Sequence, residues 1–86
     1  MVSDAAGYYE GKEHGLGVRF VAEIMEVCQD ILIQPLAWSE RDGGFRRVNC
    51  PVFPYYIAYF IRRDVVLVAA VAHASRHPDY WKRRVP

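Results

Sequence analysis

The chain has 86 residues, of which 52% are hydrophobic and 24% are charged, and its formal net charge is +1. A chain of this length forms one domain over residues 1–86, because two separate cores would leave each half too small to fold. The longest apolar run, Val65–Ala72, is far shorter than the roughly 18–20 residues of a membrane span, and the N-terminus lacks the basic and apolar regions of a secretory signal. These features exclude a disordered tail and predict a soluble, cytoplasmic domain without a membrane partner.

Charge is distributed unevenly along the chain. Residues 1–45 hold three basic side chains against eight acidic ones, a net charge of −5. Residues 46–86 hold eight basic side chains against Asp64 and Asp79, a net charge of +6. A basic half of this kind is typical of a surface that faces phosphate or an acidic partner, although a merely solvated cationic surface has the same composition. We expect the arginines of this half to form one cationic surface.

The first predicted helix is short. Ser3 is a suitable N-cap for a helix that starts at Asp4, where an acidic residue interacts favourably with the helix dipole. Gly7 interrupts this helix, and we expect it to end near Gly11. The glycine-rich residues 14–17 predict a turn before the next helix.

The second predicted helix begins at Leu16 and has a much clearer period. Arg19 and Glu23 are spaced to form an i,i+4 ion pair on its polar side. Gln34 and Pro35 end the helix, because the residue before a proline avoids the α region. The apolar face is expected at Leu16, Phe20, Ile24, Val27 and Ile31, widened by Val21, Met25, Cys28 and Leu32.

Three strand-like runs follow this helical hairpin of residues 4–34: Phe45–Cys50, Tyr55–Ile61 and Val65–Ala72. The first has the polar residues and closing proline of an edge strand, whereas the third is almost continuously apolar, as expected of a central strand covered on both faces. Residues 62–64 form a tight reversal, and Pro78 suits the first turn of a helix that runs to Arg84. The predicted fold class is α+β in the order α-α-β-β-β-α: a helical hairpin packed on a three-strand antiparallel meander, with a short C-terminal helix.

Several segments carry a recognisable pattern. In the predicted sheet and after it, the pattern is FPYxIxY at Phe53–Tyr59, AVAHxxR at Ala70–Arg76 and PxYW at Pro78–Trp81. Further upstream, it comprises Tyr8–Glu10, Leu16–Phe20, and Pro35 with Trp38. Together these segments resemble the RelE/ParE superfamily of type II toxins, over about residues 5–84. Within the superfamily the chain is most similar to the plasmid-stabilisation, ParE-like branch.

The resemblance implies a toxin of a toxin–antitoxin module. Some ParE-like members poison DNA gyrase, whereas RelE-like members are endoribonucleases that cut messenger RNA on the ribosome. The implied partner is a short acidic antitoxin, which folds as it binds, seats an apolar helix against the sheet and meets the arginines with its acidic residues. A toxin–antitoxin hetero-oligomer is therefore expected.

Two departures from the family pattern are visible. Family members have a β-strand before the helical hairpin, whereas this sequence starts almost on the helix. Either the coding start lies upstream, or the chain is a truncated and non-toxic remnant. The second departure is Ser75, which replaces the first of two paired arginines after His73.

RNA cleavage by the RelE-like route needs a base for the 2′-hydroxyl, an acid for the leaving 5′-oxygen and cations for the transition state. The candidate catalytic residues are Arg46, Arg47 and Arg76 as cations, His73 as base and Tyr80 as acid. Against this reading, RelE-like toxins have an arginine where this chain has Tyr56. Structural roles are the alternative: a hydrogen-bonded histidine at a strand end, and a C-terminal helix packed through Tyr80 and Trp81.

A binding toxin needs only a complementary surface, so catalysis is not required of it. The candidate residues for contact with the target or the antitoxin are Arg46, Arg47, Tyr56, Arg76, Lys82, Arg83 and Arg84. Cys28 and Cys50 form no Cys-x-x-Cys pair, and His14 and His77 are far apart in the sequence. We therefore expect no metal site and no cofactor.

Overall fold

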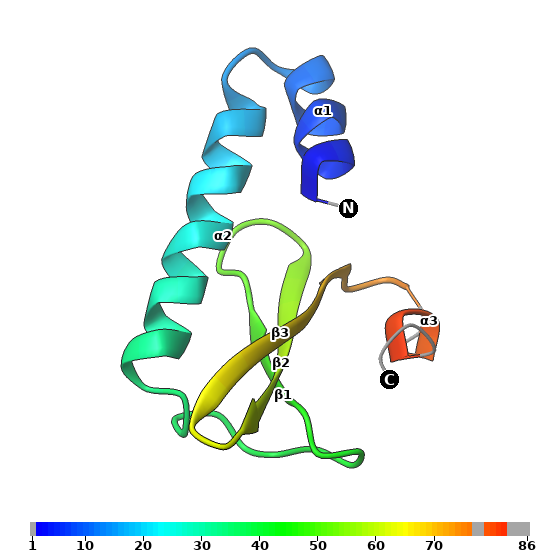
Figure 1. Cartoon of the computed structure of the whole chain (residues 1–86). Coiled ribbons are helices and arrows are strands. Elements are labelled where there is room, and N and C mark those ends of the chain that lie inside the picture. Colours follow the sequence, from blue (N-terminus) through cyan, green and yellow to red (C-terminus); the bar gives the residue numbers. More distant parts are fainter. Residues whose placement is uncertain (1, 77–78, 83–86) are drawn as a thin grey trace.

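The computed structural model describes residues 2–76 and 79–82. The elements are α1 (Val2–Lys12), α2 (Leu16–Ile33), β1 (Arg46–Asn49), β2 (Tyr55–Arg62), β3 (Val65–His73) and α3 (Asp79–Lys82). Their order confirms the α+β class and the sequence α-α-β-β-β-α. Figure 1 shows the α1–α2 hairpin standing beside the twisted sheet, with its closed end beyond the end of the sheet.

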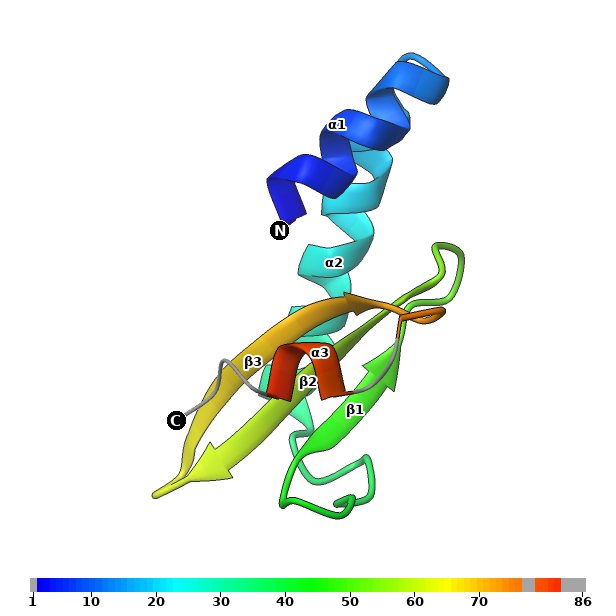
Figure 2. The ribbon, with the colours of Figure 1, turned by 90° about the vertical axis from the view of Figure 1, so that its right-hand side faces the viewer.

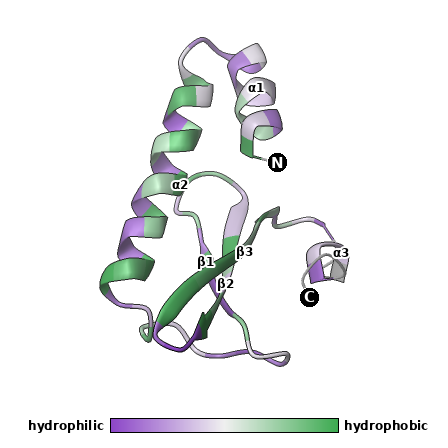
Figure 3. Cartoon of the chain, in the orientation of Figure 1, coloured by the Kyte–Doolittle hydropathy of each residue, from purple (hydrophilic) through white to green (hydrophobic). Residues whose placement is uncertain are grey.

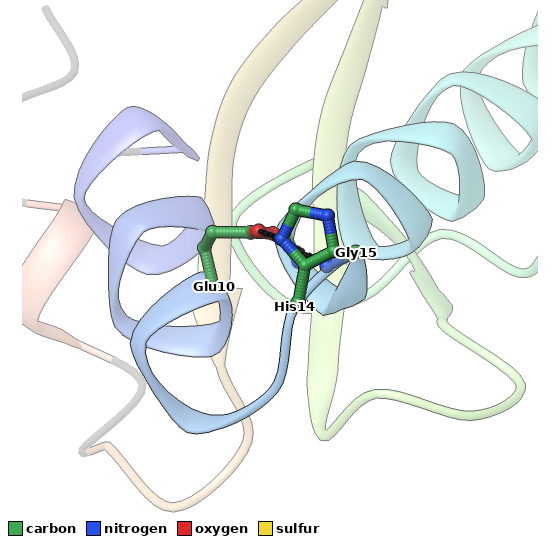
Figure 4. A network of polar contacts seen from close by, with 4 residues as sticks. Glu10, His14 and Gly15 are labelled. Carbon is green, nitrogen blue, oxygen red and sulfur yellow. Dashed lines mark hydrogen bonds and ion pairs between the residues drawn. The ribbon is translucent and has the colours of Figure 1, made fainter.

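A carboxylate closes the hairpin between α1 and α2. Glu10 accepts hydrogen bonds from the backbone N–H groups of Gly15 at 3.0 Å and Gly17 at 3.1 Å, and contacts Nδ1 of His14 at 3.1 Å (Figure 4). These N–H groups lie at the start of α2, where the first backbone donors of a helix have no intrahelical acceptor. The two N–H groups are the main reason that the pKa of Glu10 lies below its ordinary value. Glu10 therefore caps α2 from the preceding helix.

The inner face of α2 packs on the sheet as its period predicts. Phe20, Ile24, Val27 and Ile31 are all buried in the main core, together with residues of the sheet. The expected widening of this face is only half correct, because Val21 and Cys28 pack against the core but Met25 and Leu32 are 60% and 67% exposed. The two exposed side chains lie on the side of α2 that faces away from the sheet.

The predicted ion pair between Arg19 and Glu23 is wrong. Arg19 instead lies 3.8 Å from the carboxylate of Glu13. Glu23 accepts hydrogen bonds from the backbone N–H groups of Val52 at 3.2 Å and Phe53 at 2.9 Å. Two N–H donors satisfy a carboxylate better than one exposed arginine does, so Glu23 ties α2 to the loop between β1 and β2.

The sheet is an antiparallel meander in the order β1-β2-β3. β2 is therefore central, and the expectation that the third strand is central is wrong. Val65, Leu67 and Val68 of β3 are exposed, and Figure 3 shows this strand as hydrophobic over most of its length. In a three-strand meander the last strand must be an edge, whatever its composition. The reversal into β3 uses positive φ at Arg63 and Asp64, as in tight two-residue hairpins.

The sheet separates two hydrophobic clusters. On the hairpin face, Ile57 and Tyr59 of β2 pack with the buried side of α2. On the opposite face, Tyr56 and Ala58 pack with Trp81 of α3. Figure 2 shows α3 lying across that second face, with α2 behind the sheet. The expected packing of the C-terminal helix through Trp81 is confirmed, since Trp81 is 4% exposed and Tyr80 packs at the edge of the same cluster.

Candidate functional site

A cluster of two cations and three aromatic rings lies on the α3 face of the sheet. The members of this basic–aromatic cluster are Phe45, Arg47, Tyr56, Trp81 and Lys82. The guanidinium of Arg47 lies 3.9 Å from the ring centroid of Tyr56, and Nζ of Lys82 lies 4.9 Å from that of Phe45. Phe45 and Trp81 meet edge to face with centroids 5.1 Å apart.

Each part of the cluster is held from a different element. Arg47 belongs to β1, and its Nε donates a hydrogen bond to Oδ1 of Asn49 at 3.2 Å. Tyr56 belongs to the central strand, and its hydroxyl accepts a hydrogen bond from Nε1 of Trp81 at 2.9 Å. That bond fixes α3 and hence Lys82. A guanidinium stacked on a ring still has donors in its own plane, so Arg47 suits contact with a carboxylate or a phosphate group.

Acidic side chains border the cluster on one side. Glu40 and Asp42, with Arg41, line a cavity of about 440 Å³ that also includes Arg47 and Lys82. The cluster is thus a mixed surface, with its two cations on the sheet and α3 and its carboxylates in the loop before β1. A partner that contacts both cations in this cavity therefore also meets those carboxylates.

A second group of candidate residues lies at the end of β3. His73, Arg76 and Tyr80 line a cavity of about 550 Å³, which Tyr55 of β2 and Tyr8 of α1 also line. The guanidinium of Arg76 lies 5.0 Å from the ring centroid of Tyr80. Burial raises the pKa of Tyr55, and Arg76 opposes that rise. We call this site the β3-end cavity.

The hydrogen bonds of His73 fix its tautomer. The backbone N–H of Ser75 donates to Nδ1 of His73 at 3.1 Å, and the hydroxyl of Ser75 lies 2.7 Å from the same nitrogen. A backbone N–H is always a donor, so Nδ1 is the acceptor and the proton of the neutral ring resides on Nε2. The ring also meets Tyr55 edge to face at 5.0 Å. The nitrogen that would act as a base is therefore already engaged by Ser75.

Arg46 belongs to neither group. Its Nη1 donates a hydrogen bond to the backbone carbonyl of Trp38 at 2.6 Å, on the hairpin face. Burial raises the pKa of Tyr59 there, and Arg46 opposes that rise. The hydroxyl of Tyr59 donates to the carbonyl of Pro35 at 2.7 Å, so both side chains hold the loop that follows α2. The side chain of Arg46 therefore stabilises the loop after α2 and is not part of the basic–aromatic cluster.

The expected single cationic surface is therefore wrong for the described residues. Arg46 and Arg47 are neighbours on β1, and successive strand residues point to opposite faces. Of the five candidate catalytic residues, the structure brings His73, Arg76 and Tyr80 to one cavity and places Arg46 and Arg47 elsewhere. Of the candidate contact residues, it brings together Arg47, Tyr56 and Lys82. Arg83 and Arg84 lie outside the described residues.

Sequence reasoning missed several residues that build these sites. Phe45 was open to prediction, because its spacing of two from Arg47 and four from Asn49 puts all three on one face of an extended strand. The pairings of Glu23 and Ser75 carried no comparable signal, since each depends on how a loop approaches the side chain.

Within residues 2–76 and 79–82, no three His, Cys, Asp or Glu side chains gather as metal ligands would. No helix in the same part of the chain is both long and apolar enough to cross a membrane.

The fold and these surfaces define a small α+β domain with two cations stacked on aromatic rings. Residues 3–78 match the family model described as the ParE toxin of the type II toxin–antitoxin system, parDE. The chain therefore belongs to the ParE toxin family, and the family implies a cognate antitoxin as its partner. No match to the chain was found among the curated proteins or among the solved structures.

Proposed function

We propose that this toxin inhibits growth by binding a target such as DNA gyrase, and that a cognate short acidic antitoxin neutralises it. The observation that carries the proposal is the basic–aromatic cluster, in which Arg47 and Lys82 are held on ring faces. Side chains that are already ordered lose little conformational freedom when a carboxylate or phosphate binds. The family match supports the same class of protein, since it covers most of the chain.

Binding accounts for the arrangement of the candidate residues better than cleavage does. A nuclease needs its base, its acid and its cations around one phosphate. Arg46 and Arg47 lie on opposite faces of the sheet, away from the β3-end cavity. The ring nitrogen of His73 that could take up a proton, Nδ1, already accepts a hydrogen bond from the backbone N–H of Ser75. A binding surface has no such requirement, because its cations contact different groups of a partner.

Gyrase inhibition is tested in a supercoiling assay with the purified full chain. We expect Arg47→Gln to lower inhibition at least about tenfold, because it removes a stacked cation from the surface. Arg63→Gln is the matched control, since Arg63 lies in the exposed β2–β3 turn. Inhibition that is absent from the wild-type chain, or equal in both variants, would reject gyrase binding through this cluster.

The antitoxin is tested by co-expression. A ligand that binds only the folded state raises its stability by mass action, by about 2.7 kcal/mol at a hundredfold excess over Kd. We expect an acidic antitoxin segment to raise the melting temperature, and Arg47→Gln to reduce that rise. An unchanged melting temperature with the wild-type chain would contradict neutralisation by direct binding.

A second candidate function is ribosome-dependent cleavage of messenger RNA, and the β3-end cavity favours it. Three candidate catalytic residues, His73, Arg76 and Tyr80, line that cavity. Primer extension on messages from induced cells tests this function: new cleavage ends that Arg76→Gln abolishes would support it, and their absence would remove it. Unimpaired growth on induction of the folded chain would instead indicate a non-toxic remnant.

A further inference from the structure

The outer side of α2 carries a mostly apolar seam that no part of residues 2–76 and 79–82 covers. The seam consists of Val18, Ala22, Met25, Gln29 and Leu32, which are all exposed. Their spacing alternates four and three residues, which is the repeat of a helix that packs along another helix. A surface helix of a monomer ordinarily has charged residues opposite its core face. In α2 the charged residues lie to one side, so two opposite sides of the helix are apolar.

The apolar surface continues from this outer seam towards α1. Ala6 and Gly7 of α1, together with Val18, Val21 and Met25 of α2, line a groove of about 560 Å³. The two helices of the hairpin therefore form one apolar face, on the side away from the sheet.

The chain also exposes more surface than a compact monomer. Its accessible area is 6097 Å², whereas a monomer of 9.9 kDa exposes about 5200 Å². The radius of gyration is 13.2 Å against about 12 Å for a compact chain of this length. Figure 1 shows the reason, since the hairpin extends beyond the sheet.

We propose that the outer seam is a self-association surface, through which α2 packs antiparallel against α2 of a second copy. In this register Met25 lies over Ala22 of the second copy, and the reverse contact follows by two-fold symmetry. The two hairpins then form a four-helix arrangement that covers both seams and both grooves. The core already holds α2 in its helical form, so association does not bear the cost of forming the helix.

The charges beside the seam are complementary for two copies in this antiparallel arrangement. Arg19 and Glu26 each follow a seam residue by one position, and antiparallel helices bring equivalent flanking positions together. The register that pairs Met25 with Ala22 also brings Arg19 beside Glu26 of the second copy, twice in each dimer. In a parallel pair the two copies of each flanking position lie on opposite sides of the seam, so Arg19 and Glu26 would not meet in this way. The internal contact of Arg19 with Glu13 is an exposed pair at 3.8 Å and is easily exchanged.

The first test is sedimentation equilibrium of the full chain without an antitoxin. We expect a mass of about twice 9.9 kDa at high concentration, with a concentration-dependent return to monomer. Val18→Lys places two ammonium groups in the seam of each dimer and should raise the dissociation constant at least about tenfold. Val52→Lys is the matched control, because Val18 and Val52 are both 72% exposed and only Val18 lies in the seam.

The second test concerns the antiparallel register and needs no apolar replacement. Arg19→Glu alone and Glu26→Arg alone should each weaken the dimer, and the double variant should restore it. A wild-type chain that stays monomeric at all concentrations would overturn the proposal, even if an antitoxin then covers the seam. Equal dimerisation of Val18→Lys and Val52→Lys would overturn it as well. Circular dichroism confirms that each variant is folded before its mass is interpreted.

Discussion

The hydrogen bond between Trp81 and Tyr56 makes the docking of α3 open to a single-atom test. Tyr56 is 1% exposed, and its hydroxyl accepts the indole N–H of Trp81 at 2.9 Å. Tyr56→Phe removes that oxygen and leaves the ring under Arg47 in place. A buried donor that loses its acceptor costs about 1–3 kcal/mol. We expect this cost to fall on the docking of α3, because the rest of the sheet keeps its contacts.

The cost converts directly into a docking equilibrium. A loss of 1–3 kcal/mol lowers the ratio of docked to undocked α3 by a factor of about 5–150. α3 spans only four residues, Asp79–Lys82, and its remaining attachment is mainly the packing of Trp81 and Tyr80 on the sheet. Lys82 moves with α3, and the cluster then loses one of its two cations. Binding through the cluster should weaken by up to the same factor.

The fluorescence of Trp81 reports on the docking of α3 once the other tryptophan has been replaced. The chain has two tryptophans, Trp38 and Trp81. A Trp38→Phe background keeps the Trp38 carbonyl that Arg46 uses. In this background, Tyr56→Phe should shift the Trp81 emission to longer wavelength and increase its quenching by iodide. Tyr59→Phe is the control, because it removes a hydrogen bond on the opposite face. Unchanged emission and quenching in Tyr56→Phe would refute the docking role of the hydrogen bond.

Three further predictions concern the hairpin and the thiols. Gly17→Ala should lower the free energy of unfolding by about 1–3 kcal/mol, because its Cβ would lie 2.5 Å from the carbonyl oxygen of Ala6. A Cβ at Gly7 would have no atom within 4 Å, so Gly7→Ala should raise the free energy of unfolding by up to about 1 kcal/mol. Urea unfolding measures both effects, and changes of the same sign in the two variants would contradict this prediction. The lowered pKa of Glu10 gives stability above the unfolded pKa of about 4.3, which is lost as pH falls through the lower folded value. The melting temperatures of wild type and Glu10→Gln should therefore converge in acid, and a gap independent of pH would count against the Glu10 cap. Burial raises the pKa of Cys50 to about 11, so alkylation at neutral pH should be much slower in the folded chain than in urea.

The helix α2 was predictable because its apolar residues have a clear repeat in the sequence. The buried face of α2 follows from the spacing of Phe20, Ile24, Val27 and Ile31, and the antiparallel meander follows from short connections. The position of β3 was not predictable in the same way. A continuous apolar run such as Val65–Ala72 is typical of a central strand, but the same run occurs on an edge that a further element covers. The apolar composition of a strand indicates that its surface is covered, but it does not identify the element that covers it.

The same limit explains Met25 and Leu32. Both were expected in the core because they are apolar and lie near the buried stripe, yet a helix of 18 residues has more apolar positions than one sheet covers. The helical period separates the core face of α2 from its outer side only when the alternating spacing of four and three residues from Val18 to Leu32 is recognised as a seam of its own. Pairings that involve a loop, such as that of Glu23, depend on tertiary approach and leave no local signal.

The positions of the arginines could have been predicted, and they decide how the two candidate functions are separated. A strand has a period of two, so Arg46 and Arg47 could never share a face once β1 was recognised. Arg47 belongs to the basic–aromatic cluster, whereas Arg76 belongs to the β3-end cavity. A binding toxin should therefore lose activity with Arg47→Gln and retain it with Arg76→Gln, and a nuclease should show the reverse. Since the two residues have no contact with each other, a single pair of variants distinguishes the mechanisms.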